Sequence, residues 1–316
     1  VNTQLSTSVG WYNGLVSGDF DNDGDMDYIA GNAGQNSFYS PSDEYPVDIY
    51  GKDFDSNGSY DAIPAVYLPA SETDTTRKEF PAQSRDDLIK QMIEFRNKFK
   101  TYKEYGTATF DKFLTKEQLN GALLLSANNF KTSYIRNDGN DQFTIIALPA
   151  QAQISGIFGM VAEDVDGDGN LDVIMNGNDY GTEVSVGRYD ALNGLVLKGD
   201  GKGNFEPLTI LQSGIFIPGN GKALVKFFNK SGECFLAASQ NRGPLKVFLM
   251  KQQQHLVPVQ FNETYALLKL KNGKTRKQEL HYGEGFLSQS GRFINTNAQV
   301  VSVDIFDSKG NKRTFY

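Results

Sequence analysis

The chain has little of several residue types that carry common chemistry or cross-links. It holds one cysteine in 316 residues, Cys234, so no internal disulfide can form. Because Phe235, Leu236 and Ala237 follow it, we expect this thiol to lie in the core. Two histidines leave few candidates for a general base near neutral pH. No apolar run approaches the roughly 18 residues of a membrane-spanning helix, so none is predicted.

The acidic residues are concentrated in three short stretches. The net charge is 31 − 38 = −7, which disfavours binding to nucleic acid or an anionic membrane. Residues 19–27, 53–61 and 164–172 hold five, three and four carboxylates. Without these twelve carboxylates the net charge of the remaining residues would be 31 − 26 = +5. The acidity of the protein is therefore mainly that of three loops.

The three stretches share the pattern D-x-D-x-[DN]-G-x-x-D. Carboxylates this close repel one another unless a cation lies between them. Calcium accepts six to eight oxygen ligands in a flexible cage, and glycine at position 6 lets the chain bend around it. Position 7 would contribute its backbone carbonyl. The pattern therefore predicts three calcium ions, with ligands at Asp19, Asp21, Asp23, Asp25 and Asp27; at Asp53, Asp55, Asn57, Ser59 and Asp61; and at Asp164, Asp166, Asp168, Asn170 and Asp172.

These loops differ from EF-hands. An EF-hand needs a bidentate glutamate at position 12 and a helix on each side. Position 12 is Ala30, Pro64 or Met175, and the flanking residues favour strands. The aspartate at position 9 would replace the missing glutamate. We therefore expect calcium sites of the strand–loop–strand kind.

The loops resemble FG-GAP/VCBS repeats, the calcium-loop repeats of β-propellers. The segments 137–143 and 199–205 are similar to the N-x-G-x-G-x-F turn of such a blade, and 285–292 resembles the core of the UnbV/ASPIC module. The resemblance implies an all-β fold, with propeller blades in residues 1–262 and a small β module in 263–316. It also implies a secreted, periplasmic or cell-surface protein.

Alternating apolar residues predict the strands of two blades. In one, a strand near Gly159 precedes the third acidic stretch, and Asp172–Met175, Leu195–Gly199 and Phe205–Ile210 follow it. In a later one, we expect four strands, at Ala223–Phe228, Cys234–Ser239, Leu245–Met250 and Leu256–Phe261. The first two acidic stretches begin only 34 residues apart, which leaves two alternatives: a short first blade, or a blade with an inner strand at Pro46–Gly51.

Residues 84–130 interrupt the strand pattern. Ser84 and Thr115 open helix-capping signatures, and Leu88, Met92, Phe95 and Phe99 recur at helical spacing. We expect a helical insertion within a blade. In the last 50 residues, Asn272-Gly273 predicts a hairpin with a type I′ turn between Leu267–Leu270 and Gln278–Tyr282.

No catalytic residue is assigned from the sequence. His281 and Tyr282 could act as the base pair of a calcium-dependent polysaccharide lyase, but neighbours on a strand point to opposite faces. The favoured hypothesis is a binding or scaffold module for a glycan or protein ligand, with the lyase as the alternative. Because the sequence begins at Val1, we expect a processed or trimmed product whose natural form continues upstream.

Overall fold

The computed structural model describes residues 3–183, 186–251 and 255–316. The chain forms two compact units. The first unit comprises Val1–Thr7, Trp11–Phe38 and Lys131–Tyr316, and the second comprises Ser8–Gly10 and Tyr39–Phe130. Antiparallel strands dominate both units and the helices are short, so the all-β class is confirmed.

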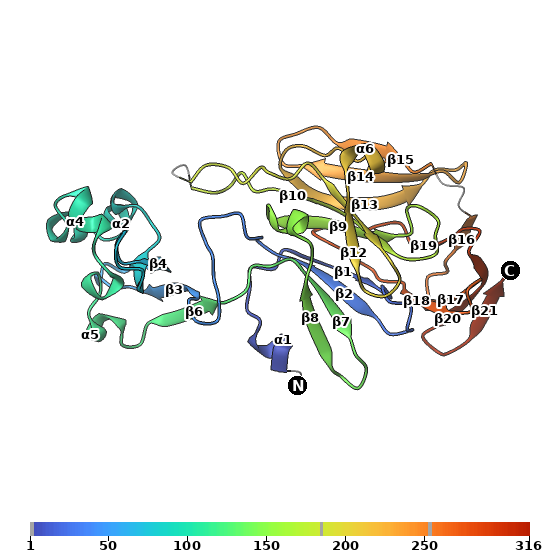
Figure 1. Cartoon of the computed structure of the whole chain (residues 1–316), viewed down its shortest axis with the longest axis horizontal. Helices are drawn as coiled ribbons and strands as arrows, with labels where there is room; N and C mark the ends of the chain where they lie inside the picture. The colour runs from blue at the N-terminus through green and yellow to red at the C-terminus, as the bar shows by residue number, and fades with distance from the viewer. Residues whose placement is uncertain (1–2, 184–185, 252–254) are drawn as a thin grey trace. The chain divides into compact units, whose positions relative to one another are not determined.

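Three antiparallel sheets build most of the first unit (Figure 1). The β1 sheet contains β1 (Gly14–Gly18), β2 (Asp27–Gly31), β7 (Ser133–Asn137) and β8 (Phe143–Ala147), in that spatial order. The β9 sheet contains β9 (Ile157–Glu163), β10 (Asp172–Gly177), β11 (Leu195–Gly199) and β12 (Phe205–Leu208). The β13 sheet has β13 (Gly221–Phe228), β14 (Cys234–Gln240) and β15 (Lys246–Leu249).

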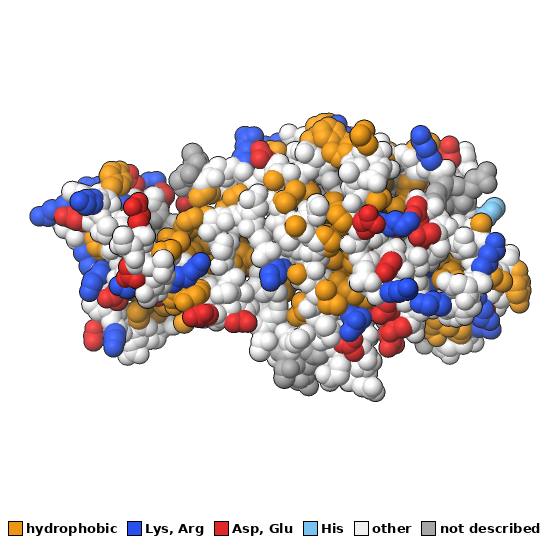
Figure 2. All heavy atoms as spheres, viewed as in Figure 1, with side chains coloured by type: hydrophobic (Ala, Val, Ile, Leu, Met, Phe, Trp, Pro, Cys, Tyr) orange, Lys and Arg blue, Asp and Glu red, His pale blue; other side chains and the backbone are white. Residues whose placement is uncertain are grey.

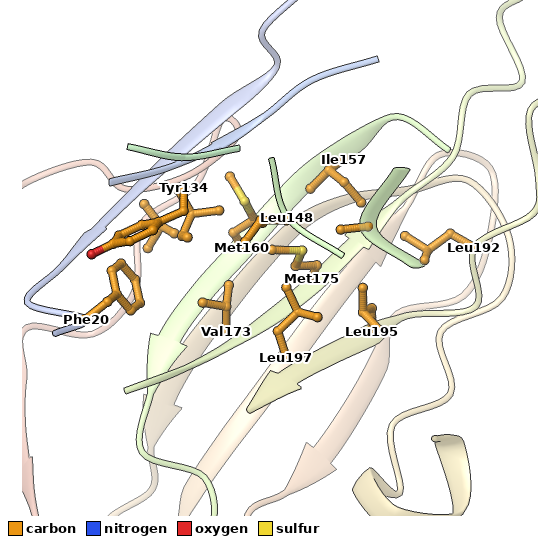
Figure 3. Packing of buried hydrophobic residues seen from close by; sticks show 13 residues of the cluster. Phe20, Tyr134, Leu148, Ile157, Met160, Val173, Met175, Leu192, Leu195 and Leu197 are labelled. Carbon is orange, nitrogen blue, oxygen red and sulfur yellow. The ribbon is translucent and has the colours of Figure 1, made fainter. Parts of the chain in front are cut away.

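The β9 sheet packs between the other two. Successive side chains on a strand point to opposite faces, so Met160 belongs to one core and its neighbour Val161 to the next. Met160 and Met175 pack with residues of the β1 sheet such as Tyr134, as Figure 3 shows. Val161 packs with Leu224 and other residues of the β13 sheet. One sheet therefore supplies two hydrophobic cores.

The first strands of the three sheets lie side by side. Strand β9 packs against both β1 and β13 (Figure 1). Two glycines permit this approach. A Cβ at Gly14 would lie 2.4 Å from the carbonyl oxygen of Phe158, and one at Gly159 would lie 2.5 Å from that of Lys222. Both distances are too short for any side chain, so these positions require glycine.

The predicted strand at Leu256–Phe261 does not join the β13 sheet. The observed strand β16 (His255–Pro258) instead pairs with β19 (Phe293–Thr296) as a separate two-stranded sheet. The prediction was wrong because alternation shows that a segment is extended but does not identify its partner. The predicted strand at Phe205–Ile210 is also shorter, since β12 ends at Leu208 and α6 (Ile210–Ser213) begins two residues later.

The second unit contains its own sheet as well as helices. Its strands are β3 (Val47–Lys52), β4 (Asp61–Pro69), β5 (Arg77–Pro81) and β6 (Leu123–Ala127), in the spatial order β5-β4-β3-β6. The helices are α2 (Arg85–Gln91), α3 (Phe95–Lys98), α4 (Tyr102–Gly106) and α5 (Lys116–Leu119), with η1 (Phe110–Lys112). Ser84 and Thr115 cap α2 and α5 as predicted. The segment at Pro46–Gly51 lies in this sheet and is no inner strand of the β1 sheet.

The C-terminal residues form a four-stranded sheet in the order β18-β17-β20-β21. These are β17 (Glu263–Leu270), β18 (Thr275–Glu279), β20 (Val300–Asp307) and β21 (Lys312–Phe315). The predicted type I′ turn is wrong: it needs positive φ at both central residues, and Asn272 does not have it. Only Gly273 does, with φ 84°, and its N–H donates to the carbonyl of Leu270 at 3.0 Å. In the described part of the chain, no helix has the length and apolar character needed to cross a bilayer.

Candidate metal centres

Each acidic stretch is a tight connection between two antiparallel strands. The first loop, Asp19–Asp27, joins β1 to β2, and the third loop, Asp164–Asp172, joins β9 to β10. The second loop, Asp53–Asp61, joins β3 to β4 in the other unit. None is flanked by helices, as the sequence predicted.

The aspartate at position 1 organises the turn in each loop. In the first loop, the N–H groups of Asp23 and Gly24 each donate to Asp19 at 3.1 Å. In the second loop, Asn57 and Gly58 donate in the same way to Asp53, at 3.0 and 2.9 Å.

The third loop follows the same plan. The N–H of Gly169 donates to Oδ2 of Asp164 at 2.9 Å, and Gly167 donates to its Oδ1 at 2.7 Å. Gly169 has φ 96°, a left-handed conformation that side chains rarely adopt. The glycine at position 6 is therefore required by the bend.

The aspartate at position 9 closes each loop. Oδ2 of Asp27, Asp61 and Asp172 accepts a bond from the N–H at position 2, at 3.2, 3.0 and 2.9 Å. Asp27 and Asp172 also each bond the end of the third strand, accepting from Asn137 at 2.8 Å and from Gly199 at 2.9 Å. These hydrogen bonds connect the start of each glycine-rich segment, at the end of β7 and of β11, to an acidic loop.

The loops bring some of the predicted ligands together and leave others apart. Three carboxylates per loop have oxygens within 4.8 Å of one another: Asp19, Asp21 and Asp23; Asp53, Asp55 and Asp61; and Asp164, Asp166 and Asp172. Asp27 lies outside the group of its loop. The side chain of Asn170, at position 7, accepts a hydrogen bond from Asn22 at 3.0 Å.

Burial makes the carboxylates hard to ionise. Desolvation raises the pKa of Asp19 to about 6 and those of Asp27 and Asp172 to about 7. Desolvation also raises the pKa of Asp164. Hydrogen bonds from backbone N–H groups oppose the shift at Asp19, Asp27 and Asp172 but are smaller. A bound cation would stabilise the ionised forms, so the donor set fits a hard divalent ion.

A lysine lies at the edge of the third loop. The ammonium group of Lys198, on β11, contacts Asp166 and lies 3.2 Å from Asp168. These carboxylates raise the pKa of Lys198. Its charge offsets part of the acidity of this loop.

The C-terminal sheet reaches both loops of the first unit, a contact that the sequence did not predict. The backbone N–H of Lys277, on β18, donates to Oδ2 of Asp19 at 2.9 Å. Arg276 donates to the carbonyl of Gly169 at 2.8 Å, and the side chain of Asn297 donates to Asp164 at 2.6 Å. In the sequence, the basic residues at 274–277 were the only indication of a contact with the acidic loops, and they do not show which loop is the partner.

A small polar cavity lies among β1, β9, β13 and β18. It encloses about 60 Å³, room for a few water-sized groups. On its wall, Nζ of Lys226 lies 2.6 Å from Oε2 of Glu163, and both side chains are at most a tenth exposed. Glu284 also lines it, as do residues 289–292 of the segment that resembles the UnbV/ASPIC core.

The histidine of this cavity is poorly arranged for catalysis. Nε2 of His281 lies 3.1 Å from Oγ of Ser17 and 3.3 Å from Oε2 of Glu279. Both contacts are made by Nε2. A catalytic histidine passes a proton with one ring nitrogen while a second group orients the other nitrogen, and this arrangement is not seen here among the residues that the structure describes. The hydroxyl of Tyr282 donates to the carbonyl of Phe261 at 3.1 Å. His281 and Tyr282 thus have separate partners. Both follow the end of β18 at Glu279, so the predicted strand at Gln278–Tyr282 extends too far and the expected alternation of these two side chains does not apply.

Comparison of the chain with protein-family models gives no match. Comparison with curated proteins gives none either. The proposals below therefore depend on the geometry of the chain itself.

Proposed function

We propose that the protein is a calcium-binding β-propeller module of the FG-GAP/VCBS kind, which acts outside the cytoplasm as a binding or scaffold unit for a glycan or protein ligand. The observation that carries the proposal is the repeated placement of the acidic loop. In the β1 and β9 sheets alike, it joins the first strand to the second and is bonded through position 9 to the end of the third.

The sheet arrangement supports the propeller part of the proposal. Blades of a propeller pack face to face with their first strands around a common centre. In support, the β9 sheet shares one hydrophobic core with the β1 sheet and another with the β13 sheet, and β9 packs against both β1 and β13. One strand and one loop of the C-terminal region would complete the ring: β18 packs beside β1, and Gly291, in the loop before β19, donates to the carbonyl of Lys226 on β13 at 2.8 Å.

Calcium would bind through three carboxylates per loop, with further oxygens from backbone and water. It supplies positive charge that holds the strand ends together and is not required to do chemistry. A lyase has no observation in its favour, because His281 and Tyr282 do not converge on one point.

Isothermal titration of metal-stripped protein tests the proposal. We expect about three calcium ions to bind, and magnesium to bind more weakly because it demands a tight octahedron. Changing both Asp19 and Asp21 to Asn should remove one ion from the count. Stoichiometry near zero, or no change in the double variant, would contradict the proposal.

A further inference from the structure

The β13 sheet ends in a free strand edge. The β1 and β9 sheets have four strands each, whereas the β13 sheet has three. Among the described residues, the only hydrogen-bonded neighbour of β15 is β14. The segment expected as a fourth strand is paired with β19 instead.

The backbone of β15 has unused hydrogen-bonding groups at this edge. The N–H of Met250 donates to the carbonyl of Cys234 at 3.0 Å, toward β14. Bonding direction alternates along a strand, so the N–H and C=O groups of Val247 and Leu249 point away from β14. Both side chains are 50% exposed. Such an edge is a template for one more strand.

An apolar groove runs beside the free edge. Its volume is about 630 Å³, within the range of ligand pockets. It lies between the β9 and β13 sheets and under α6, and its lining includes Ile174, Val196, Leu208, Ile215, Leu236 and Phe248. Leu211 on α6, at its rim, is 98% exposed. Figure 2 shows hydrophobic side chains gathered near α6 and β15, at the top of the view. A strand added beside β15 would place alternate side chains in this groove.

The charge beside the groove is positive. Residues 234–262 contain no Asp or Glu, while Arg242, Lys246 and Lys251 flank or form β15. Asp166 lies on the opposite wall, where Lys198 contacts it. Like charges that face each other across paired strands are unfavourable. A second copy of β15 would place lysine near lysine, so an acidic strand is the better match.

We propose that β15 binds an extended segment of a partner protein in which apolar and acidic residues alternate. The segment adds to the β13 sheet as its fourth strand. Its apolar side chains enter the groove beside Phe248, and its negative charge is attracted by Lys246 and Lys251 at the two ends of β15. Main-chain bonds provide affinity and alternate side chains provide specificity, as in other cases of strand addition.

A labelled peptide tests the proposal on the whole chain. The probe is a fluorescein-labelled heptapeptide in which glutamate alternates with valine, followed by fluorescence anisotropy in excess calcium and in EGTA. We expect it to bind at least tenfold more tightly than a peptide of the same composition with its valines in one block. We expect the peptide to bind in EGTA as well. The result therefore tests strand addition at β15 independently of whether the acidic loops bind calcium.

Two variants locate the site. Val247→Pro removes one outward N–H without removing a bond to β14, and should weaken binding at least tenfold. The double change Lys246→Glu and Lys251→Glu should reverse the preference, toward a heptapeptide in which lysine alternates with valine. Lys271→Glu with Lys309→Glu, at exposed positions of the C-terminal sheet, is the matched control and should leave the preference for glutamate unchanged.

Three results would overturn the proposal. The alternating and block peptides bind equally, or the charge-reversed variant keeps its preference for glutamate. Alternatively, the free protein dimerises in size-exclusion chromatography and Val247→Pro makes it monomeric, which would assign the edge to a second copy. The preference measured with the charge variants decides the matter even if Val247→Pro fails to fold.

Discussion

The side chain of Asn22 donates a hydrogen bond to Oδ1 of Asn170 at 3.0 Å and so joins the first acidic loop to the third. Asn170 is at position 7 of its loop, where the motif assigns only a backbone carbonyl to the ion. Its side chain therefore links two loops. This separates the role of Asn170 from that of Asp172, two residues later.

We expect Asp172→Ala to lower the calcium affinity of the third loop at least tenfold, about 1.4 kcal/mol. The change removes a carboxylate and also leaves the N–H groups of Val165 and Gly199 without their acceptor. Asn170→Ala should lower the affinity about threefold or less, roughly 0.6 kcal/mol. Isothermal titration compares the two variants. Equal losses, or a larger loss at Asn170, would show that the loop geometry is misassigned.

The acidic loops could be predicted from the sequence because their hydrogen bonds are local. The bond from Gly169 to Asp164, for example, spans five residues. Partners distant in the sequence could not be predicted. Strand β16 pairs with β19 across some 40 residues, and Asp19 meets Lys277 across 258. Alternation fixes which face of a strand is apolar, but it contains no information about the partner strand.

The two alternatives for the first blade failed for a related reason. Both assumed that the loop at Asp53 belongs to the same consecutive series of blades as β1. The structure places it in the second unit, a separate body with its own apolar cluster around Phe95 and Phe113. Strands β2 and β7 pair directly across the insertion. A repeat pattern alone does not tell an inserted copy from a consecutive one.

Removal of calcium should lower the melting temperature, because an ion bound only to the folded state stabilises it by mass action. Asp53→Asn with Asp55→Asn should destabilise only the second unit, since this loop lies within it. Hydrogen exchange measured by mass spectrometry can show this as faster exchange in residues 39–130 alone. An unchanged melting curve in excess EGTA, or faster exchange throughout the chain, would contradict the prediction.

The stability of the metal-stripped protein should decrease as the pH rises from about 4 to about 7. Burial raises the pKa of Asp27 and Asp172 from 3.8 to about 7, so in this window the folded state binds more protons than the unfolded state. Calcium needs the ionised forms, so its stabilising effect should instead grow with pH. Melting temperatures with and without calcium, at pH 5, 6 and 7.5, provide the check. Asp27→Asn serves as the control: without calcium, its melting temperature should fall less steeply with pH than that of the unchanged protein.

Lys198→Met should raise the calcium affinity of the third loop by about fivefold, or ~1 kcal/mol. The ammonium group of Lys198 contacts Asp166 and Asp168, so an incoming ion has to compete with it. Lys202→Met, an equal change of charge at an exposed position nearby, should have a smaller effect. Titration of both variants decides the matter. Equal gains would mean that only net charge counts.

The ion pair between Glu163 and Lys226 gives the last prediction. Both side chains are buried beside the polar cavity, and their atoms lie 2.6 Å apart. Lys226→Met leaves the carboxylate of Glu163 buried without its partner, which should cost about 3–5 kcal/mol of the free energy of unfolding. Adding Glu163→Leu to that variant removes the orphaned charge and should restore part of the loss. Urea denaturation of the two single variants and the double variant measures the coupling. A double variant less stable than Lys226→Met alone would show that the cavity needs the carboxylate for another purpose.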